Sequence, residues 1–312
     1  MKRKNICKCL ILALITAAVI ISSGCNLAED VSDDSSKEAE IERGLTALDK
    51  SDYENARKIF ESLKNKYPSD NTLKAYYSNA LAGLAGLDTY NLMKAIDDLD
   101  KMGESGDTIA IVGRTLTGAD STQSPSLTEA QISSKKDNFE DAMDALLEIA
   151  QKDYSTLAEN KVAGKTAAAK TILADSLQNK DLAELTNDEL VQLGLMALNH
   201  GILIIADMII IDSPESEITF SKNSFKNLYE ANAPFDTEDI TSKLKKLSLD
   251  IELINNAVYA IDNFLNNGSE KENDISKEFE IFKTDLDNGQ GGSEAGDNFI
   301  TQAELEYYLN NL

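Results

Sequence analysis

His200 is the only histidine in the chain, so catalytic proton transfer through an imidazole would have to use it. Asp207 follows seven residues later, about two helical turns along the same face. No G-x-S-x-G sequence supplies a nucleophile for such a pair. A zinc site needs several ligands, and one histidine without a free cysteine does not provide the usual set. We therefore expect a hydrogen-bonded core histidine, no enzymatic activity and no metal site.

Gly164-Lys165-Thr166 has the residue types of a phosphate-binding loop, in which backbone N–H groups and a lysine hold phosphate oxygens. That motif begins with a glycine five residues earlier, and Glu159 stands there instead. The carboxylates crowded within 97–100 reflect the acidity of the chain and lie in no segment that would raise a pKa. Neither pattern predicts nucleotide binding or glycoside hydrolysis, and no cofactor is expected.

The C-terminal segment 296–305 resembles the second half of a calcium-binding EF-hand. Three residues match loop positions 5, 8 and 12: Asp297, Ile300 and Glu304. Three others do not match positions 1, 3 and 6: Ser293, Ala295 and Asn298. Asp285 and Asp287 would contribute only through a longer, irregular loop. The alternative is a glycine-rich loop before a helix that Thr301 caps with Glu304 as its partner.

The first residues have the order of an export signal. A basic start is followed by the twelve-residue apolar run 10–21, which only Thr16 interrupts, and then by Ser22-Ser23-Gly24-Cys25. The run is shorter than the about 20 residues that a membrane-spanning helix needs. Small residues leading directly into a cysteine resemble the lipobox of bacterial lipoproteins, although Ser22 stands where that family usually has leucine.

This resemblance implies that residues 1–24 are removed and that Cys25 is acylated. The other two cysteines, Cys7 and Cys9, lie in the removed segment, so the mature chain cannot form an internal disulfide. Two or more acyl chains anchor a protein stably. Asn26, rather than aspartate, follows the cysteine, which favours the outer membrane facing the periplasm if the host is Gram-negative.

The charge of the chain restricts its partners. It contains 54 acidic and 30 basic residues, and the signal removes four basic ones, so the mature charge is 26 − 54 = −28. Such a chain repels phosphate backbones, which excludes nucleic acid as a partner. It also repels anionic lipid head groups, so we expect membrane contact through the lipid anchor only.

Apolar residues recur at spacings of three and four through most of the mature chain, which predicts an all-α fold. The capping residues Asp52, Asp70 and Thr186 mark helix starts, the last with Glu189 as a capping-box partner, and either Ser126 or Thr128 is a candidate start for a short helix before residue 135. We predict helices at 38–49, 53–66, 70–86, 89–102, 135–151, 155–178, 186–211, 237–266, 272–286 and 301–311.

Several segments differ from this pattern. Residues 25–37 form an acidic, serine-rich tether. The segment 104–134 reads as a long loop, in which 109–116 is either a strand or an apolar stretch packed on the helices. Residues 190–211 are the most apolar internal segment, and we expect the central buried helix of an all-α C-terminal region, 135–312, rather than a membrane span.

Gly44, Ala56, Phe60 and Pro68 are spaced by 12, 4 and 8 residues. This series resembles one tetratricopeptide repeat, in which small and large residues lock two helices together and a proline closes the unit. A second, degenerate unit begins at Asn71. The resemblance covers 38–103 and implies helical hairpins followed by a larger irregular helical bundle.

Repeats of this family usually bind extended peptides or helices in a concave face. Carrying those positions over implies partner contacts at Ile41, Leu45, Leu48, Asn79 and Ala82, although Leu45 and Leu48 could instead pack against a neighbouring helix. We therefore expect a lipid-anchored envelope protein that acts as a protein–protein interaction scaffold for an envelope protein or peptide. The alternative is an envelope lipoprotein that binds a small molecule or a divalent cation.

Overall fold

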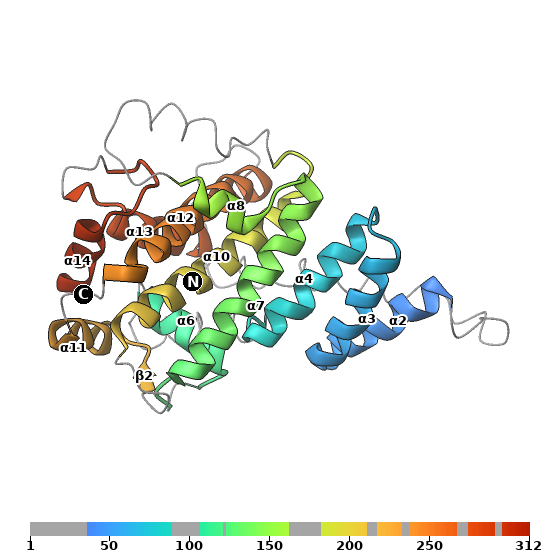
Figure 1. Cartoon of the computed structure of the whole chain (residues 1–312), viewed down its shortest axis with the longest axis horizontal. Coiled ribbons are helices and arrows are strands. Elements are labelled where there is room, and N and C mark those ends of the chain that lie inside the picture. The colour runs from blue at the N-terminus through green and yellow to red at the C-terminus, as the bar shows by residue number, and fades with distance from the viewer. Residues whose placement is uncertain are drawn as a thin grey trace, which may run out of the picture.

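The computed structural model describes residues 36–88, 107–120, 123–161, 182–210, 217–232, 237–266, 274–290 and 295–312. Helices make up 76% of these residues and strands 3%, which confirms the all-α class. The signal, Cys25, nearly all of the tether, the helix expected at 89–102 and most of the one expected at 155–178 lie outside the described residues. Along the longest axis of the molecule, α2 lies at one end and α11 and α14 at the other (Figure 1).

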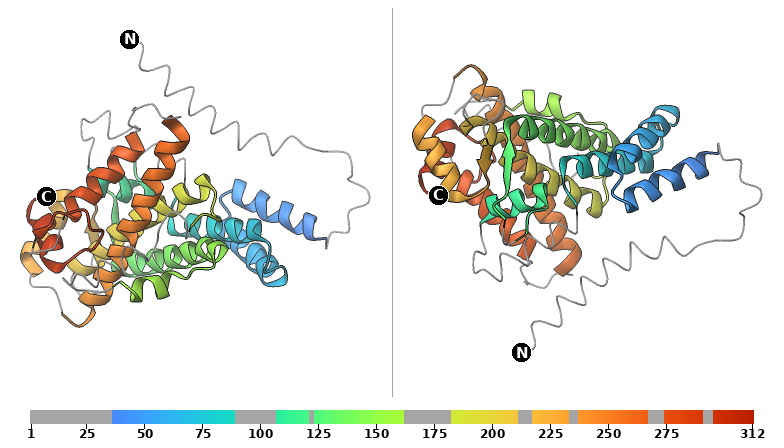
Figure 2. Two further views of the ribbon diagram at one scale, coloured as in Figure 1. Left: turned by 90° about the horizontal axis from the view of Figure 1, so that it is seen from above. Right: turned by 90° about the horizontal axis from the view of Figure 1, so that it is seen from below.

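Three helices form an N-terminal arm, which we define as residues 36–88: α2 (Lys37–Asp49), α3 (Tyr53–Lys66) and α4 (Asn71–Ala85). Each helix begins after a capping residue whose side-chain oxygen accepts a hydrogen bond from a backbone N–H of the first turn. The capping residues are Ser36, Asp52 and Asp70, in that order. The expected boundaries were correct to within one residue. The arm lies at the edge of the molecule in all three views (Figures 1 and 2).

The remainder, the body, is built around α7 (Glu129–Leu147), α10 (Asn187–Ile209) and α12 (Thr237–Asn266). Helix α10 packs on both α7 and α12, and α4 joins the arm to α7. Thr128 and Thr186 form capping boxes at the starts of α7 and α10. Helix α10 is long and apolar enough to cross a membrane, but 72% of its most apolar stretch is buried inside the protein, as expected of a core helix.

The segment 104–134 is not a long loop. Asp107 caps a helix, α6 (Thr108–Thr117), so the expectation of a strand or an irregular stretch at 109–116 was wrong. The strand is instead β1 (Ser126–Thr128), which pairs antiparallel with β2 (Glu217–Thr219). All nine residues from Thr108 to Leu116 are buried, and a short apolar run of this kind cannot be assigned to a helix or a strand from its pattern alone.

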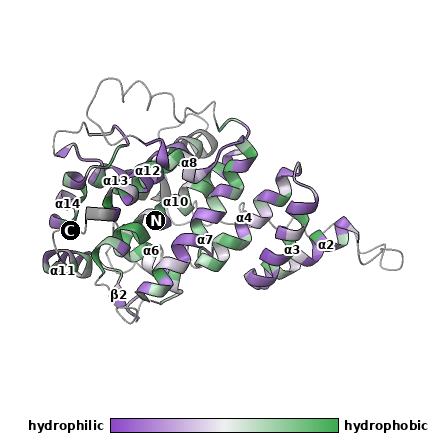
Figure 3. Ribbon diagram, in the orientation of Figure 1, coloured by the Kyte–Doolittle hydropathy of each residue, from purple (hydrophilic) through white to green (hydrophobic). Residues whose placement is uncertain are grey.

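The other elements surround this centre. They are η2 (Glu148–Ala150), α8 (Tyr154–Glu159), α11 (Lys222–Asn232), α13 (Asp274–Leu286) and α14 (Gln302–Asn310). Thr128, and not Ser126, is the cap, and it starts the single helix α7 at Glu129 instead of a separate short helix before residue 135; α11 was not predicted. In Figure 3, hydrophobic residues predominate on α6 and the adjoining part of α10, whereas hydrophilic residues predominate on α3.

Candidate functional site

The arm has a small core of its own, and its centre is the contact between Gly44 and Phe60. Phe60 is fully buried, and a Cβ atom placed on Gly44 would lie 2.5 Å from its Cζ. Ala56 is also fully buried. Six buried residues make up this core: Ala47, Ala56, Phe60, Leu63, Leu73 and Ala80. The small and large residues of the predicted repeat motif therefore meet in space.

The expected partner-binding residues separate into two groups. Ile41, Leu45 and Leu48 lie on α2, are half-buried, and pack on the core of the arm. Asn79 is also half-buried. Ala82, by contrast, is 3% exposed and belongs to the core of the body, so it cannot line an open groove. Helix α2 packs chiefly on α3, which leaves part of the apolar stripe Ile41, Leu45 and Leu48 accessible.

His200 lies in a polar network that joins α7, α8, α10 and α12. Its Nδ1 is 2.8 Å from Asp250 Oδ2, and its Nε2 is 3.2 Å from Glu140 Oε1. The Tyr154 hydroxyl donates to Asp250 Oδ1 at 2.9 Å, and Lys246 Nζ donates to Glu140 Oε1 at 2.6 Å. Every polar end of the histidine therefore has a partner, which confirms the expected hydrogen-bonded core residue.

The charges in this network reinforce one another. Burial disfavours the imidazolium, but the carboxylates of Asp250 and Glu140 outweigh burial and raise the His200 pKa to about 9. Burial likewise disfavours the Glu140 carboxylate, yet His200 and Lys246 lower its pKa to about 2. At neutral pH His200 is thus protonated and donates to both carboxylates. Because His200, Asp250 and Tyr154 are fully buried, the network stabilises the packing of helices and offers no surface for a substrate.

Asp207, which lies two helical turns from His200, makes a separate contact. Its Oδ2 lies 2.6 Å from Lys136 Nζ of α7 and 3.3 Å from Lys243 Nζ of α12. Two ionic layers therefore cross the junction of α7, α10 and α12. Sequence reasoning identified His200 but missed its partners, which lie 46 to 60 residues away along the chain.

The C-terminal loop between α13 and α14 uses its carboxylates as hydrogen-bond acceptors. Thr301 and Glu304 form the expected capping box, and Glu304 also accepts the Gly289 N–H at 2.8 Å. Asp287 accepts the Gly296 and Asn298 N–H groups at 2.9 and 2.8 Å. Within the described part of the chain, no three acidic, histidine or cysteine side chains gather as a metal ion would require. Cation binding gains no support from these residues.

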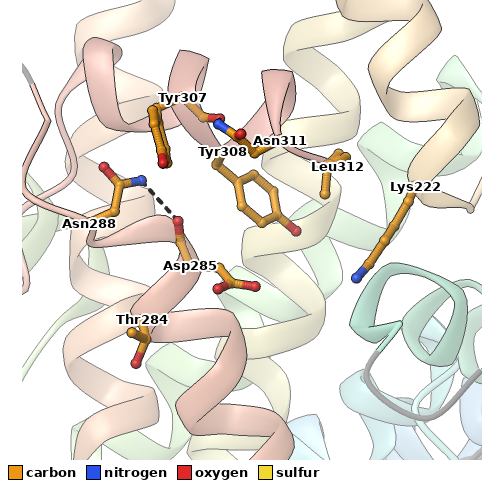
Figure 4. Close-up of a pocket in the computed structure, with 8 residues that line it drawn as sticks. All are labelled: Lys222, Thr284, Asp285, Asn288, Tyr307, Tyr308, Asn311 and Leu312. Atoms are coloured by element: carbon orange, nitrogen blue, oxygen red, sulfur yellow. Dashed lines mark hydrogen bonds between the residues drawn. The ribbon is translucent and has the colours of Figure 1, made fainter.

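A pocket of about 170 Å³ lies beside this loop, where α11, α13 and α14 meet (Figure 4). Tyr308 is 6% exposed, and its hydroxyl and the Asp285 carboxylate point into the space that Lys222 faces (Figure 4). Burial first, and then the charge of Asp285, raises the Tyr308 pKa, so the phenol stays neutral. The pocket thus presents the Lys222 ammonium, the Asp285 carboxylate and the Tyr308 hydroxyl. None of these three groups forms a hydrogen bond to another described residue.

No protein-family model matches the chain, and neither a curated protein nor a solved structure matches it significantly. Functional inference consequently rests on the residues and their geometry.

Proposed function

We propose that this protein is a lipid-anchored envelope scaffold that holds another envelope protein or peptide on its N-terminal arm. The supporting observation is the apolar stripe Ile41, Leu45 and Leu48 on the outermost helix of the arm. These side chains are only half-buried although α2 already packs on α3. Partly exposed apolar residues on a terminal helix are suited to bind an amphipathic helix or extended peptide.

Anchoring is tested by cell fractionation. In a Cys25→Ala variant the thiol that would carry the lipid is absent, so we expect the protein to leave the membrane fraction. Cys7→Ala, in the expected signal, is the matched control and should leave membrane attachment unchanged. Sedimentation of the Cys25→Ala protein with membranes in high salt would contradict the anchor.

Partner binding is tested by crosslinked pull-down from native membranes, with mass spectrometry to identify what is captured. The paired change Leu45→Gln and Leu48→Gln should abolish capture, because it removes apolar area from the stripe. The control changes Glu42→Gln and Thr46→Gln lie at exposed positions of the same helix and should preserve capture. Helical circular dichroism of both variants establishes that α2 remains folded. Equal capture by the two variants would refute the role of the stripe.

The pocket supports a second function, the binding of a small zwitterion of amino-acid size. The opposite charges of Lys222 and Asp285 match a carboxylate and an ammonium group. Its volume is below the about 300 Å³ at which pockets for drug-sized ligands begin, so only a small molecule fits. Glycine, alanine and serine should raise the melting temperature of the wild type but not that of Lys222→Met. The stripe variant should retain this response, and an absence of any shift in the wild type would exclude the function.

A further inference from the structure

The charges of the arm almost cancel in number, but they are separated in position. Residues 36–88 contain eight basic and nine acidic residues, 8 − 9 = −1. Ion pairs and one hydrogen bond engage most of the cations on α3 and α4: Arg57 with Glu54 and Glu61, Lys58 with Glu54, Lys64 with Glu148, and Lys74 with the backbone oxygen of Glu148. These cations are therefore occupied on α3, α4 and η2 and do not compensate the carboxylates of α2.

Three carboxylates border the apolar stripe of α2. Residues three or four positions apart are neighbours on the surface of a helix. By this spacing Glu38 lies beside Ile41, at the start of the stripe. Glu42 and Asp49 lie one turn before and one turn after Leu45. All three carboxylates are exposed, and within the described part of the chain none of them forms an ion pair. We call Glu38, Glu42 and Asp49 the acidic edge.

The cations nearest to the acidic edge do not neutralise it. Lys37, at the first position of α2, pairs with Asp70 at 2.6 Å. Lys66 lies at the end of α3, with its Nζ 5.3 Å from the centre of the Tyr67 ring, and Lys37 Nζ lies 4.7 Å from the same ring. Counting both lysines against Asp70 and the acidic edge leaves 2 − 4 = −2.

The other two cations of this segment lie on the opposite side of α2. Arg43 and Lys50 are neither three nor four positions from any residue of the stripe, so they are not its neighbours. Arg43 instead lies 3.9 Å from Glu40. Residues 26–36, which precede the helix, add four acidic residues and no basic one. The surface beside the stripe is consequently negative, although the arm as a whole is nearly neutral.

We infer that the stripe receives a basic amphipathic segment of another protein, with lysine or arginine side chains beside its apolar ones. This inference rests on the proposed role of the stripe and adds the charge of the partner. The apolar side chains of the segment supply affinity, while its cations face the acidic edge, which accelerates the encounter and selects the partner. A second copy of this chain is a poorer occupant, because two stripes in contact bring together 2 × 3 = 6 unpaired carboxylates.

Two synthetic peptides serve as probes. Both carry leucines along one helical face, and they differ only at the flanking positions, which are lysine in one and glutamate in the other. Fluorescence anisotropy measures the binding of each labelled peptide to the mature chain, 25–312, in the presence of a reductant. We expect the lysine peptide to bind about eightfold more tightly at low salt, since each of three exposed charge pairs contributes about twofold. Near 1 M salt, where screening is almost complete, this ratio should approach one.

Matched variants locate the charge preference. Glu38→Gln with Asp49→Asn leaves one carboxylate of the acidic edge, so the ratio should fall to about twofold. The control Asp188→Asn with Glu230→Gln removes the same two residue types at exposed positions of the body and should keep the ratio at about eightfold. Glu42→Gln, which is part of the pull-down control, removes one carboxylate and lowers the ratio only about twofold, so capture through the apolar residues is retained.

Failure of the inference and failure of the proposed function give different results. Equal binding of the two peptides to the wild type would overturn the charge of the partner and leave the stripe as a binding site. If the variant Leu45→Gln with Leu48→Gln bound the lysine peptide as tightly as the wild type does, the stripe would not be the site and both would fail. Sedimentation velocity adds a third test, because a dimer that this variant loses would make a second copy the occupant and overturn the inference.

Discussion

The arm and the body are both helical, but different interactions hold them together. In the arm, one aromatic ring fills the space left by Gly44 and Ala56, and its ion pairs lie at the surface. In the body, a large apolar core encloses the ionic network of His200, Asp250 and Glu140. The comparison indicates that the arm depends on short-range steric fit, whereas the body depends on charges that only the complete fold can bring together.

Removing the ring should have the largest effect and should be confined to the arm. Phe60→Ala leaves a cavity in a core of six buried residues, and such changes cost about 3–5 kcal/mol. Hydrogen exchange should show loss of protection in α2 and α3 while α10 stays protected. The matched change Phe139→Ala, in the core of the body, should instead lower the protection of α10. If Phe60→Ala lowered the protection of α10 as much as that of α2 and α3, the arm would not be a separate cooperative unit.

Breaking the ionic network should destabilise the body in a pH-dependent way. His200 has a folded pKa of about 9 against 6.5 for an ordinary histidine, so its contribution is complete below pH 6.5 and disappears as the pH rises through 9. His200→Leu leaves the fully buried Asp250 carboxylate without a cation, whereas Glu140 keeps Lys246, and breaking a buried pair in this way costs about 3–5 kcal/mol at neutral pH. Urea unfolding at several pH values measures both effects. A wild-type stability that is constant from about pH 6 to 10 would contradict the protonated histidine.

Replacing a helical glycine with alanine should lower the stability of the arm but not that of the body. Gly44→Ala places a Cβ 2.5 Å from the Phe60 ring, so an overpacking cost of about 1–3 kcal/mol exceeds the about 1 kcal/mol gained from helix propensity. Gly201→Ala in α10 brings its Cβ to 3.2 Å from Cδ1 of Leu247, the end of a side chain that needs to move by only a few tenths of an ångström, so the change should be neutral or slightly stabilising. Thermal unfolding of both variants tests the contrast, and stabilisation by Gly44→Ala would refute the steric lock.

The smallest effect concerns Asp144, whose side chain accepts the Tyr154 N–H. Burial, followed by the nearby charges of Asp153 and Asp141, raises its pKa to about 6 despite that hydrogen bond. The ionised form is therefore unfavourable, and stability should increase as the pH falls from above 6 toward 3.8. Asp144→Asn keeps the acceptor without the charge and should stabilise the body at about pH 7.5 by on the order of 1 kcal/mol, after allowance for solvent screening. Destabilisation at that pH would contradict the raised pKa.

Local signals in the sequence were sufficient to predict most of the helices that the structure describes. Caps such as Asp52 and Thr186 act within one turn, and the apolar period is a property of consecutive residues, so both can be recognised without a structure. The contact of Gly44 with Phe60 was also anticipated, because its spacing resembled a known repeat. Helix α6 was missed because a short, buried apolar run does not distinguish a helix from a strand.

The sequence by itself determined the helical class, the capped boundaries, the acidity of the chain and the expectation of a lipid anchor at Cys25, because these depend on composition and on neighbouring residues. Only the tertiary structure decided which groups surround His200, since Glu140, Tyr154 and Asp250 come from three other helices. It also decided that Ala82 is internal and that Lys37 lies beside Tyr67. Such contacts arise from packing between distant segments, which no local pattern encodes.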